Sequence, residues 1–168
     1  MPTSVEEGKD WTLDKIKSLP HDYVLDIGPG AGRYADLLRD TGAVVDAVEV
    51  WEPYVAQFGL TSKYNHVYVT DFLEFATDTR YDIVIMGDVL EHFEESDALK
   101  ALDLARSIGK YVIISTPTVD WPQGPYEGNH FESHLSQFYW EDLIKFPGYL
   151  DGKNFKEVGV VLLEGTSD

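Results

Sequence analysis

The most constraining feature of the chain is a glycine turn that directly follows a short apolar segment. Residues 23–34 read YVLDIGPGAGRY, so Gly28, Gly30 and Gly32 stand at alternate positions after a β-prone stretch. Glycine allows positive φ angles and leaves room for a bound molecule to approach the backbone. The apolar residues that follow suit the opening turns of a helix. Strand, turn and helix together predict the first half of a nucleotide-binding βαβ unit.

The spacing of this turn indicates which ligand it binds. The pattern is GxGxG, so the third glycine falls one residue earlier than in the dinucleotide fingerprint GxGxxG. Asp26 stands just before the first glycine, where its carboxylate would face the ligand. A phosphate gains little from such a neighbour, whereas an ammonium or sulfonium group is attracted to it. The residues therefore favour S-adenosylmethionine over a nicotinamide dinucleotide.

Four further segments follow this turn in a recognisable order. They are VDAVEV at 45–50, TDF at 70–72, YDIVIMGDVLEHF at 81–93 and GKYVIISTP at 109–117. With DIGPGAG at 26–32, they resemble the ordered motifs of class I S-adenosylmethionine-dependent methyltransferases, over most of the chain. The resemblance implies a methyltransferase of this family with S-adenosylmethionine as its methyl donor.

The resemblance also assigns roles to individual residues. It implies that Glu49 holds the ribose hydroxyls, that Trp51 packs against the adenine and that Asp71 accepts from the adenine amino group. The complete set of implied cofactor contacts is Asp26, Gly28, Pro29, Gly30, Gly32, Glu49, Val50, Trp51, Asp71, Phe72 and Asp88. Structural alternatives stay open: Asp26 as a cap of the glycine turn, Glu49 as a solvated strand end, Asp71 as a helix N-cap and Trp51 as ordinary packing.

Alternating apolar and polar segments predict alternating strands and helices. We expect strands at 22–28, 43–50, 65–69, 81–87, 111–116 and 155–163, and helices at 11–19, 32–40, 53–58, 72–77, 94–108 and 140–146. This order requires a largely parallel sheet with right-handed crossovers. The predicted fold class is α/β: a three-layer αβα, Rossmann-like domain with a mostly parallel sheet of the seven-stranded type.

The end of the chain departs from the pattern of the family, which finishes with an antiparallel hairpin. Only one strand, at 155–163, is evident there, so we expect the C-terminal hairpin to be truncated. A second subunit in a homodimer could then cover the open sheet edge.

The region 118–138 differs from the rest of the chain. It is rich in proline, glycine, histidine and aromatic residues and shows little periodicity, which is typical of a lid or substrate loop. We expect Tyr126, His130 and His134 to bind the substrate. The two histidines are four residues apart, so a helical turn would place both on one face.

The sequence DVLEHF, which follows the strand predicted at 81–87, contains candidate catalytic residues. His92 could accept a proton from a hydroxyl group, because its unperturbed pKa lies near neutral pH. Similar spellings occur in ubiquinone-pathway O-methyltransferases and small-RNA 2′-O-methyltransferases, where the acid–histidine pair contributes to a divalent metal site. That resemblance implies Glu91 and His92 as ligands of Mg²⁺ or a similar ion. In those metal-using families the first acidic residue of this motif is usually Glu, whereas in this chain it is Asp88, whose side chain is shorter. A structural, hydrogen-bonding His92 is the third interpretation.

Composition narrows the class of protein. With 168 residues, the chain suits a single methyltransferase domain over 1–168. It has no cysteine, no long apolar run and an acidic N-terminus, which favours a cytoplasmic protein. Its net charge of -17 disfavours free nucleic acid and anionic membranes as partners. We therefore predict methyl transfer to a small-molecule acceptor, most simply at oxygen. The rivals are a cofactor-binding module without chemistry and a methyltransferase of proteins or RNA ends.

Overall fold

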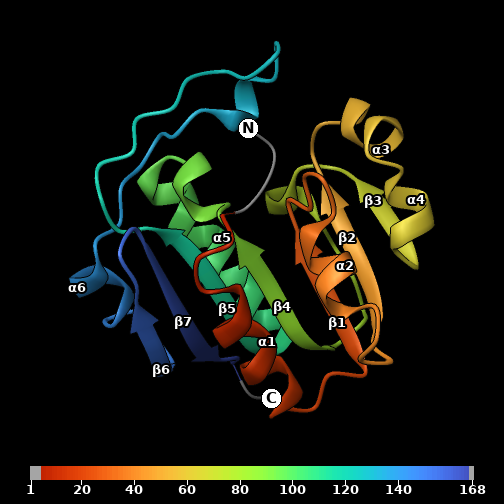
Figure 1. Ribbon diagram of the computed structural model, residues 1–168, viewed down its shortest axis with the longest axis horizontal. Coiled ribbons are helices and arrows are strands. Elements are labelled where there is room, and N and C mark those ends of the chain that lie inside the picture. Colours follow the sequence, from red (N-terminus) through yellow and green to blue (C-terminus); the bar gives the residue numbers. More distant parts are fainter. Residues whose placement is uncertain (1–4, 167–168) are drawn as a thin grey trace.

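The computed structural model describes residues 5–166 as a seven-stranded sheet between two layers of helices (Figure 1). The strand order is β3-β2-β1-β4-β5-β7-β6. The five parallel strands are β1 (Tyr23–Ile27), β2 (Val44–Glu49), β3 (His66–Val69), β4 (Tyr81–Gly87) and β5 (Gly109–Pro117). The predicted α/β, Rossmann-like fold class is therefore confirmed.

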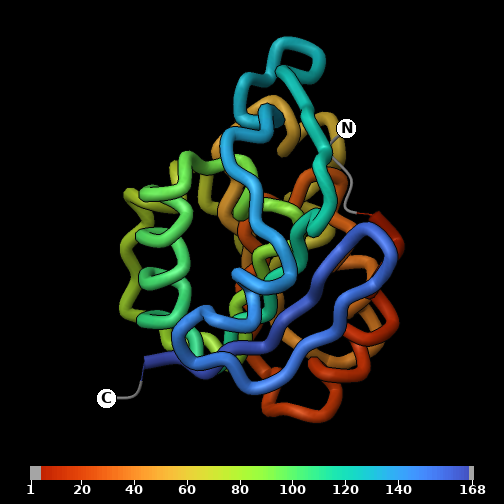
Figure 2. The backbone as a smooth tube through the Cα atoms, turned by 90° about the vertical axis from the view of Figure 1, so that its left-hand side faces the viewer, coloured from red at the N-terminus to blue at the C-terminus, as the bar shows by residue number. Residues whose placement is uncertain are grey.

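Two apolar clusters hold the helices against the sheet. On one face, Ile16, Leu38 and Leu60 anchor the helices α1 (Lys9–Lys17), α2 (Arg33–Leu38) and α4 (Leu60–Lys63). On the other face, Leu102 and Leu143 anchor α5 (Glu95–Ile108) and α6 (Trp140–Leu143). Figure 2 shows α5 on one side of the sheet and the red-to-orange segments of α1 and α2 on the other. Because helices cover both faces, every residue of β4 is buried, which explains why its sequence is apolar apart from Asp82, whose carboxylate pairs with Lys110 and accepts from the amide of Tyr23.

The predicted truncation of the C-terminal hairpin is wrong. β7 (Val158–Glu164) pairs antiparallel with β5, and β6 (Tyr149–Asn154) pairs antiparallel with β7 and forms the sheet edge. β6 escaped prediction because its sequence, YLDGKN, contains Asp, Gly, Lys and Asn and shows no apolar alternation. An edge strand needs no such alternation, because it has one neighbour and is largely exposed to water. The sheet edge is thus completed within the chain, which removes the reason given for a homodimer.

Several predicted helices are shorter than expected, and the helical turn suggested for His130 and His134 is absent. The helix predicted at 72–77 is a single 3₁₀ turn, η1 (Phe72–Glu74), and the one at 140–146 is α-helical only to Leu143. His130 and His134 do not share a helical turn, because the 3₁₀ turn η3 (His130–Glu132) ends at Ser133 in extended conformation. The prediction over 53–58 corresponds to α3 (Pro53–Gln57).

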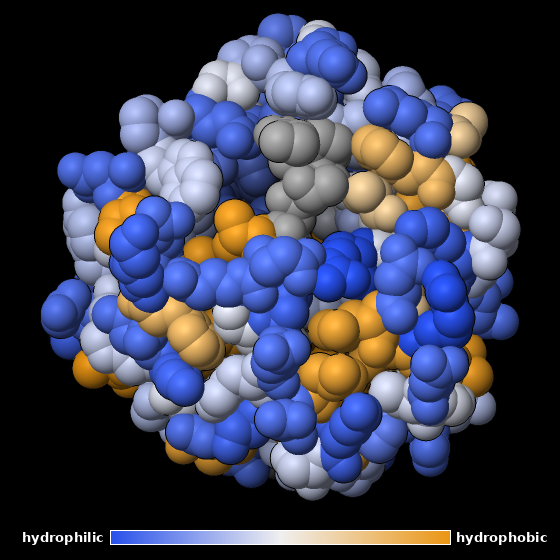
Figure 3. All heavy atoms as spheres, viewed as in Figure 1, coloured by the Kyte–Doolittle hydropathy of each residue, from blue (hydrophilic) through white to orange (hydrophobic). Residues whose placement is uncertain are grey.

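The polar character of the surface agrees with the many charged residues of the sequence. Figure 3 shows that the face seen in Figure 1 is largely hydrophilic, with scattered apolar side chains. No helix within residues 5–166 combines the length and the apolarity needed to cross a bilayer.

The glycine turn gives a test of this fold. A Cβ at Gly28, where φ is +64°, would lie 2.7 Å from Cγ2 of Val89, whereas at Gly42, where φ is +84°, it would meet nothing within 4 Å. Gly42→Ala should therefore lower the free energy of unfolding by about 1–2 kcal/mol through backbone strain alone. Gly28→Ala adds overpacking and should lower it by roughly 1–3 kcal/mol more. Urea unfolding measures both, and equal effects of the two variants would contradict this packing of the turn.

Candidate active site

A cavity of about 790 Å³ opens at the carboxyl ends of the parallel strands. In α/β sheets of this kind, ligands bind at that edge, next to the switch in strand order, which here lies between β1 and β4. The loop 118–138 rises above the same edge (Figure 1). The predicted site residues that line the cavity are Gly28, Pro29, Gly30, Glu49, Val50, Asp71, Phe72, Asp88, Glu91, His92 and His134.

The glycine turn has the predicted left-handed backbone. The φ angles are +64° at Gly28, +49° at Gly30 and +78° at Gly32. The amide of Gly28 donates to the carbonyl of Val48 at 2.9 Å, which ties the turn to the end of β2. Gly32 does not line the cavity: it is the N-cap of α2, and a Cβ there would lie 2.7 Å from the Lys63 side chain. The first two glycines thus border the ligand space, while the third allows the start of the helix.

Asp26 lies behind the turn rather than in the cavity. It is 1 % exposed, and its Oδ2 accepts a hydrogen bond of 2.5 Å from the hydroxyl of Tyr64. Its Oδ1 is buried without a hydrogen-bond partner among the described residues. Burial raises the pKa of Asp26 to about 7, although the bond from Tyr64 works in the opposite direction. A buried charged acceptor without a partner is costly in a protein interior, which agrees with the raised pKa of this carboxyl.

Glu49 reaches the cavity from the end of β2. Its Oε1 accepts from the backbone amide of Trp51 at 2.7 Å, and the side chain is buried. Burial raises its pKa to about 7, against the effect of backbone donors at Trp51, Gly30 and Val50. Trp51 itself does not line the cavity. Its ring lies 6.4 Å from that of Phe131 in the loop, which agrees with the packing interpretation of this residue.

Asp71 is an N-cap, and its position at the cavity keeps the adenine interpretation open. Its Oδ1 accepts from the amide of Leu73 at 2.9 Å, so it is the N-cap of η1, and the residue also lines the cavity beside Phe72. The two functions are compatible, because a carboxylate has a second oxygen and several lone pairs.

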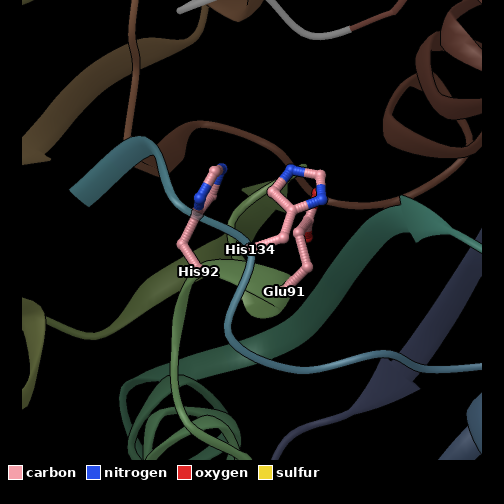
Figure 4. Close-up of side chains that lie close together, drawn as sticks. All are labelled: Glu91, His92 and His134. Atoms are coloured by element: carbon pink, nitrogen blue, oxygen red, sulfur yellow. The ribbon is translucent and has the colours of Figure 1, made fainter. Parts of the chain in front are cut away.

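Three side chains with possible metal-binding atoms lie close together in the lining of the same cavity. Ligand atoms of Glu91, His92 and His134 all lie within 4.8 Å of one another. Figure 4 shows Glu91 and His92 on the turn after β4, and His134 on the loop that passes beside it. The loop is held there by the amides of Leu135 and Ser136, which donate to the carbonyl of Glu91 at 2.8 and 3.1 Å.

Hydrogen bonds orient all three side chains. Nδ1 of His92 lies 3.1 Å from the carbonyl of Ser133, and Nδ1 of His134 lies 2.6 Å from the carbonyl of Trp121. A carbonyl only accepts, so each Nδ1 carries the proton and each Nε2 keeps its lone pair. Oε2 of Glu91 accepts from Thr116 at 3.0 Å. Burial lowers the pKa of both imidazoles, whereas burial and the charge of Asp88 raise that of Glu91.

Two predicted substrate residues lie elsewhere, and others were missed. Tyr126 and His130 are absent from the cavity lining. Charged or polar residues that were not predicted also line it, among them Arg33, Tyr54 and Glu132. The hydroxyl of Tyr54 donates to Glu132 at 3.1 Å, which joins α3 to the loop. No local pattern marks these residues, although Glu132 lies in the predicted substrate loop and Arg33 directly follows the glycine motif.

Comparison with known proteins decides the family. A family model described as a methyltransferase domain matches residues 10–157. The chain belongs to this methyltransferase family. The predictions of a class I methyltransferase and of S-adenosylmethionine as methyl donor are thereby confirmed. A search among curated proteins gave no match.

Solved structures show the same fold. A S-adenosylmethionine-dependent methyltransferase from Clostridium acetobutylicum has a TM-score of 0.74 at 13% identity, over 98% of this chain and 93% of that one. The 1,6-didemethyltoxoflavin-N1-methyltransferase of Burkholderia thailandensis, with S-adenosylhomocysteine bound, has a TM-score of 0.69 at 19% identity, over 96% and 78%. The magnesium protoporphyrin IX methyltransferase of Synechocystis, also with bound S-adenosylhomocysteine, has a TM-score of 0.66 at 20% identity, over 95% and 84%.

The buried acids of the site predict how stability depends on pH. Asp26 and Glu49 have pKa values of about 7 in the folded methyltransferase, raised by burial. In the unfolded chain both titrate near pH 4. Between about pH 4 and pH 7 the folded state therefore binds more protons, and the free energy of unfolding of the cofactor-free protein falls as the pH rises. The fall should be about 3 kcal/mol for each group.

Urea unfolding at pH 5 and pH 8 measures this effect. Glu49→Gln cannot ionise at this position and should give a flatter pH dependence than the wild type. If the free energy of unfolding instead rises from pH 5 to pH 8, burial does not raise the pKa of these two carboxyls in the folded protein.

Proposed function

We propose that this methyltransferase transfers the methyl group of S-adenosylmethionine to a small-molecule acceptor, at an oxygen atom. The observation that carries the proposal is a single cavity that contains both the family's cofactor-binding turn and the Glu91, His92 and His134 cluster. Its volume of about 790 Å³ lies in the range of small-ligand sites. The three structures compared above belong to methyltransferases, two of them named for small molecules, didemethyltoxoflavin and magnesium protoporphyrin IX.

The cofactor half of the cavity has the features that S-adenosylmethionine requires. The open backbone of Gly28 and Gly30 borders the methionine end, Glu49 accepts from the ribose hydroxyls, and Asp71 lies with Phe72 at the adenine. Asp26 lies behind the turn and outside the cavity lining, so we expect it to act on the cationic end of the cofactor through its charge rather than by direct contact, with the cofactor favouring its ionised form. The protein mainly has to align donor and acceptor, since methyl transfer is a displacement in line with the sulfonium bond.

The histidine pair supports oxygen as the methylated atom. A hydroxyl acceptor must lose its proton to become a strong nucleophile, and an imidazole with a free Nε2 lone pair can take it. Both His92 and His134 are held in this form by their backbone partners. The didemethyltoxoflavin enzyme is named as an N1-methyltransferase, so nitrogen is the alternative target within the same fold.

The same cluster fits a divalent cation. One carboxylate and two neutral imidazoles form an oxygen and nitrogen donor set, and each ligand side chain has the supporting hydrogen bond that metal sites usually have. A bound ion would act as a Lewis acid and lower the pKa of an acceptor hydroxyl. Asp88, the first acid of the DVLEH spelling, binds Ser115 and the amide of Val5 instead. The site residues proposed for the ion are Glu91, His92 and His134.

Cofactor binding and turnover test the function itself. Calorimetry should show binding of S-adenosylmethionine and S-adenosylhomocysteine at a single site. A panel of phenols, alcohols and amines, assayed with radioactive methyl donor, should give a product in which the label resides on oxygen. Binding without turnover across the panel would favour the cofactor-binding module, and label on nitrogen would overturn the oxygen assignment. Three further properties stay predictions: that the protein does not bind free nucleic acid, that it is cytoplasmic, and that it forms a homodimer.

Two loop histidines provide a matched test of the cluster. His92→Ala and His134→Ala should each abolish binding of one Mn²⁺ per chain, whereas His130→Ala, an exposed residue outside the cavity, should leave it intact. Turnover should fall roughly 100-fold in His92→Ala, within the range for loss of acid–base assistance. Absence of Mn²⁺ binding to the wild type, with turnover indifferent to chelator, would assign His92 to the role of general base without metal.

A further inference from the structure

The carboxylate of Asp88 is held on both sides by polar neighbours. Its Oδ1 accepts from the hydroxyl of Ser115 at 3.0 Å, and its Oδ2 accepts from the amide of Val5 at 3.2 Å. Asp88 also has a φ angle of +56°, in the left-handed region that non-glycine residues rarely adopt. Such a conformation persists only when the surroundings impose it. The position of this cavity-lining carboxylate is therefore set by its partners.

A buried chain of polar groups continues from Ser115 into the N-terminal helix. The hydroxyl of Tyr34 lies 3.5 Å from Oγ of Ser115, and Nζ of Lys9 donates to the same hydroxyl at 3.0 Å. Lys9 and Tyr34 are each 3 % exposed, and Ser115 is 1 % exposed. The ring of Tyr34 lies against Gly87, where a Cβ would come within 2.1 Å of it. The chain thus runs directly behind the end of β4.

The charge of Lys9 is unusual in this position. An ammonium group in the protein interior is unfavourable unless it is compensated. Lys9 also lies 4.5 Å from the centre of the Tyr34 ring. Burial raises the pKa of Asp26 and Glu91, and the charge of Lys9 partly opposes that rise. Its helix therefore supplies a buried positive charge beneath a cavity whose charged lining residues are mostly acidic.

We propose that Lys9 is a positioning residue of the methyl-transfer site. Through Tyr34 and Ser115 it fixes the carboxylate of Asp88 at the end of β4, where Asp88 contacts the amino-acid end of the cofactor. This inference rests on the proposed function, because it takes that cavity to be the cofactor site. It assigns the N-terminal helix, which contains none of the family's motifs, an indirect effect on cofactor binding.

We call the contacts from Lys9 through Tyr34 and Ser115 to Asp88 the relay. Calorimetry with S-adenosylhomocysteine tests it. Lys9→Met and Asp88→Asn should each weaken binding about tenfold, the scale of a lost hydrogen bond to a charged group. Because both variants break one chain of contacts, the double variant should also lose about tenfold, rather than the hundredfold expected of independent sites. Tyr34→Phe keeps the ring against Gly87 and removes only the hydroxyl, so it carries the test if Lys9→Met does not fold.

Lys15→Met is the matched control. Lys15 belongs to the same helix, also lies over an aromatic ring, that of Trp11, and pairs with Asp151 at 2.5 Å, away from the cavity lining. It should leave the affinity for S-adenosylhomocysteine unchanged. A hundredfold loss in the double variant, or unchanged affinity in folded Lys9→Met, Tyr34→Phe or Asp88→Asn, overturns the relay while leaving the proposed function intact. A wild-type chain that does not bind S-adenosylhomocysteine contradicts the proposed function itself, and the relay with it.

Discussion

The left-handed glycine turn after β1 is the constraint on which the rest of the site depends. Because Gly28 and Gly30 have no side chains, the backbone passes close to the ends of β2 and β4 and leaves an open space above them. The hydrogen bond from the Gly28 amide to Val48 fixes the turn to β2, and Val89 packs where a Cβ of Gly28 would lie. Glu49 and Asp88 can border one cavity only because this turn does not fill it.

Burial of acidic side chains is the second organising feature. Asp26, Glu49 and Glu91 are all almost fully buried at the same edge of the sheet, and burial raises the pKa of each. A cofactor that carries an ammonium and a sulfonium group compensates such a site, whereas a phosphate would not. The cavity is therefore better matched to its methyl donor than to a nucleoside triphosphate, and Lys9 provides the compensating charge that belongs to the protein itself.

Sequence and structure agree where apolar burial decides the conformation. The strand predicted at 81–87 is β4 without any shift, because both faces of this segment are covered and nearly all of its side chains are apolar. Sequence and structure disagree where a segment is covered on one face only or is exposed to water. β6 has too few apolar residues to be predicted, and the short helices after β3 and before β6 end early, because tertiary contacts rather than local propensity set their length.

The sequence by itself determined the order of the five parallel strands, the left-handed glycine turn and the acids at the strand ends, because each of these follows from local periodicity or from the backbone freedom of one residue type. Only the tertiary structure decided which histidine of the loop faces His92, that Asp26 lies behind the turn, and that Lys9 reaches the end of β4 through Tyr34. These contacts join residues far apart in the chain, and their geometry depends on how the loop and the N-terminal helix pack on the sheet.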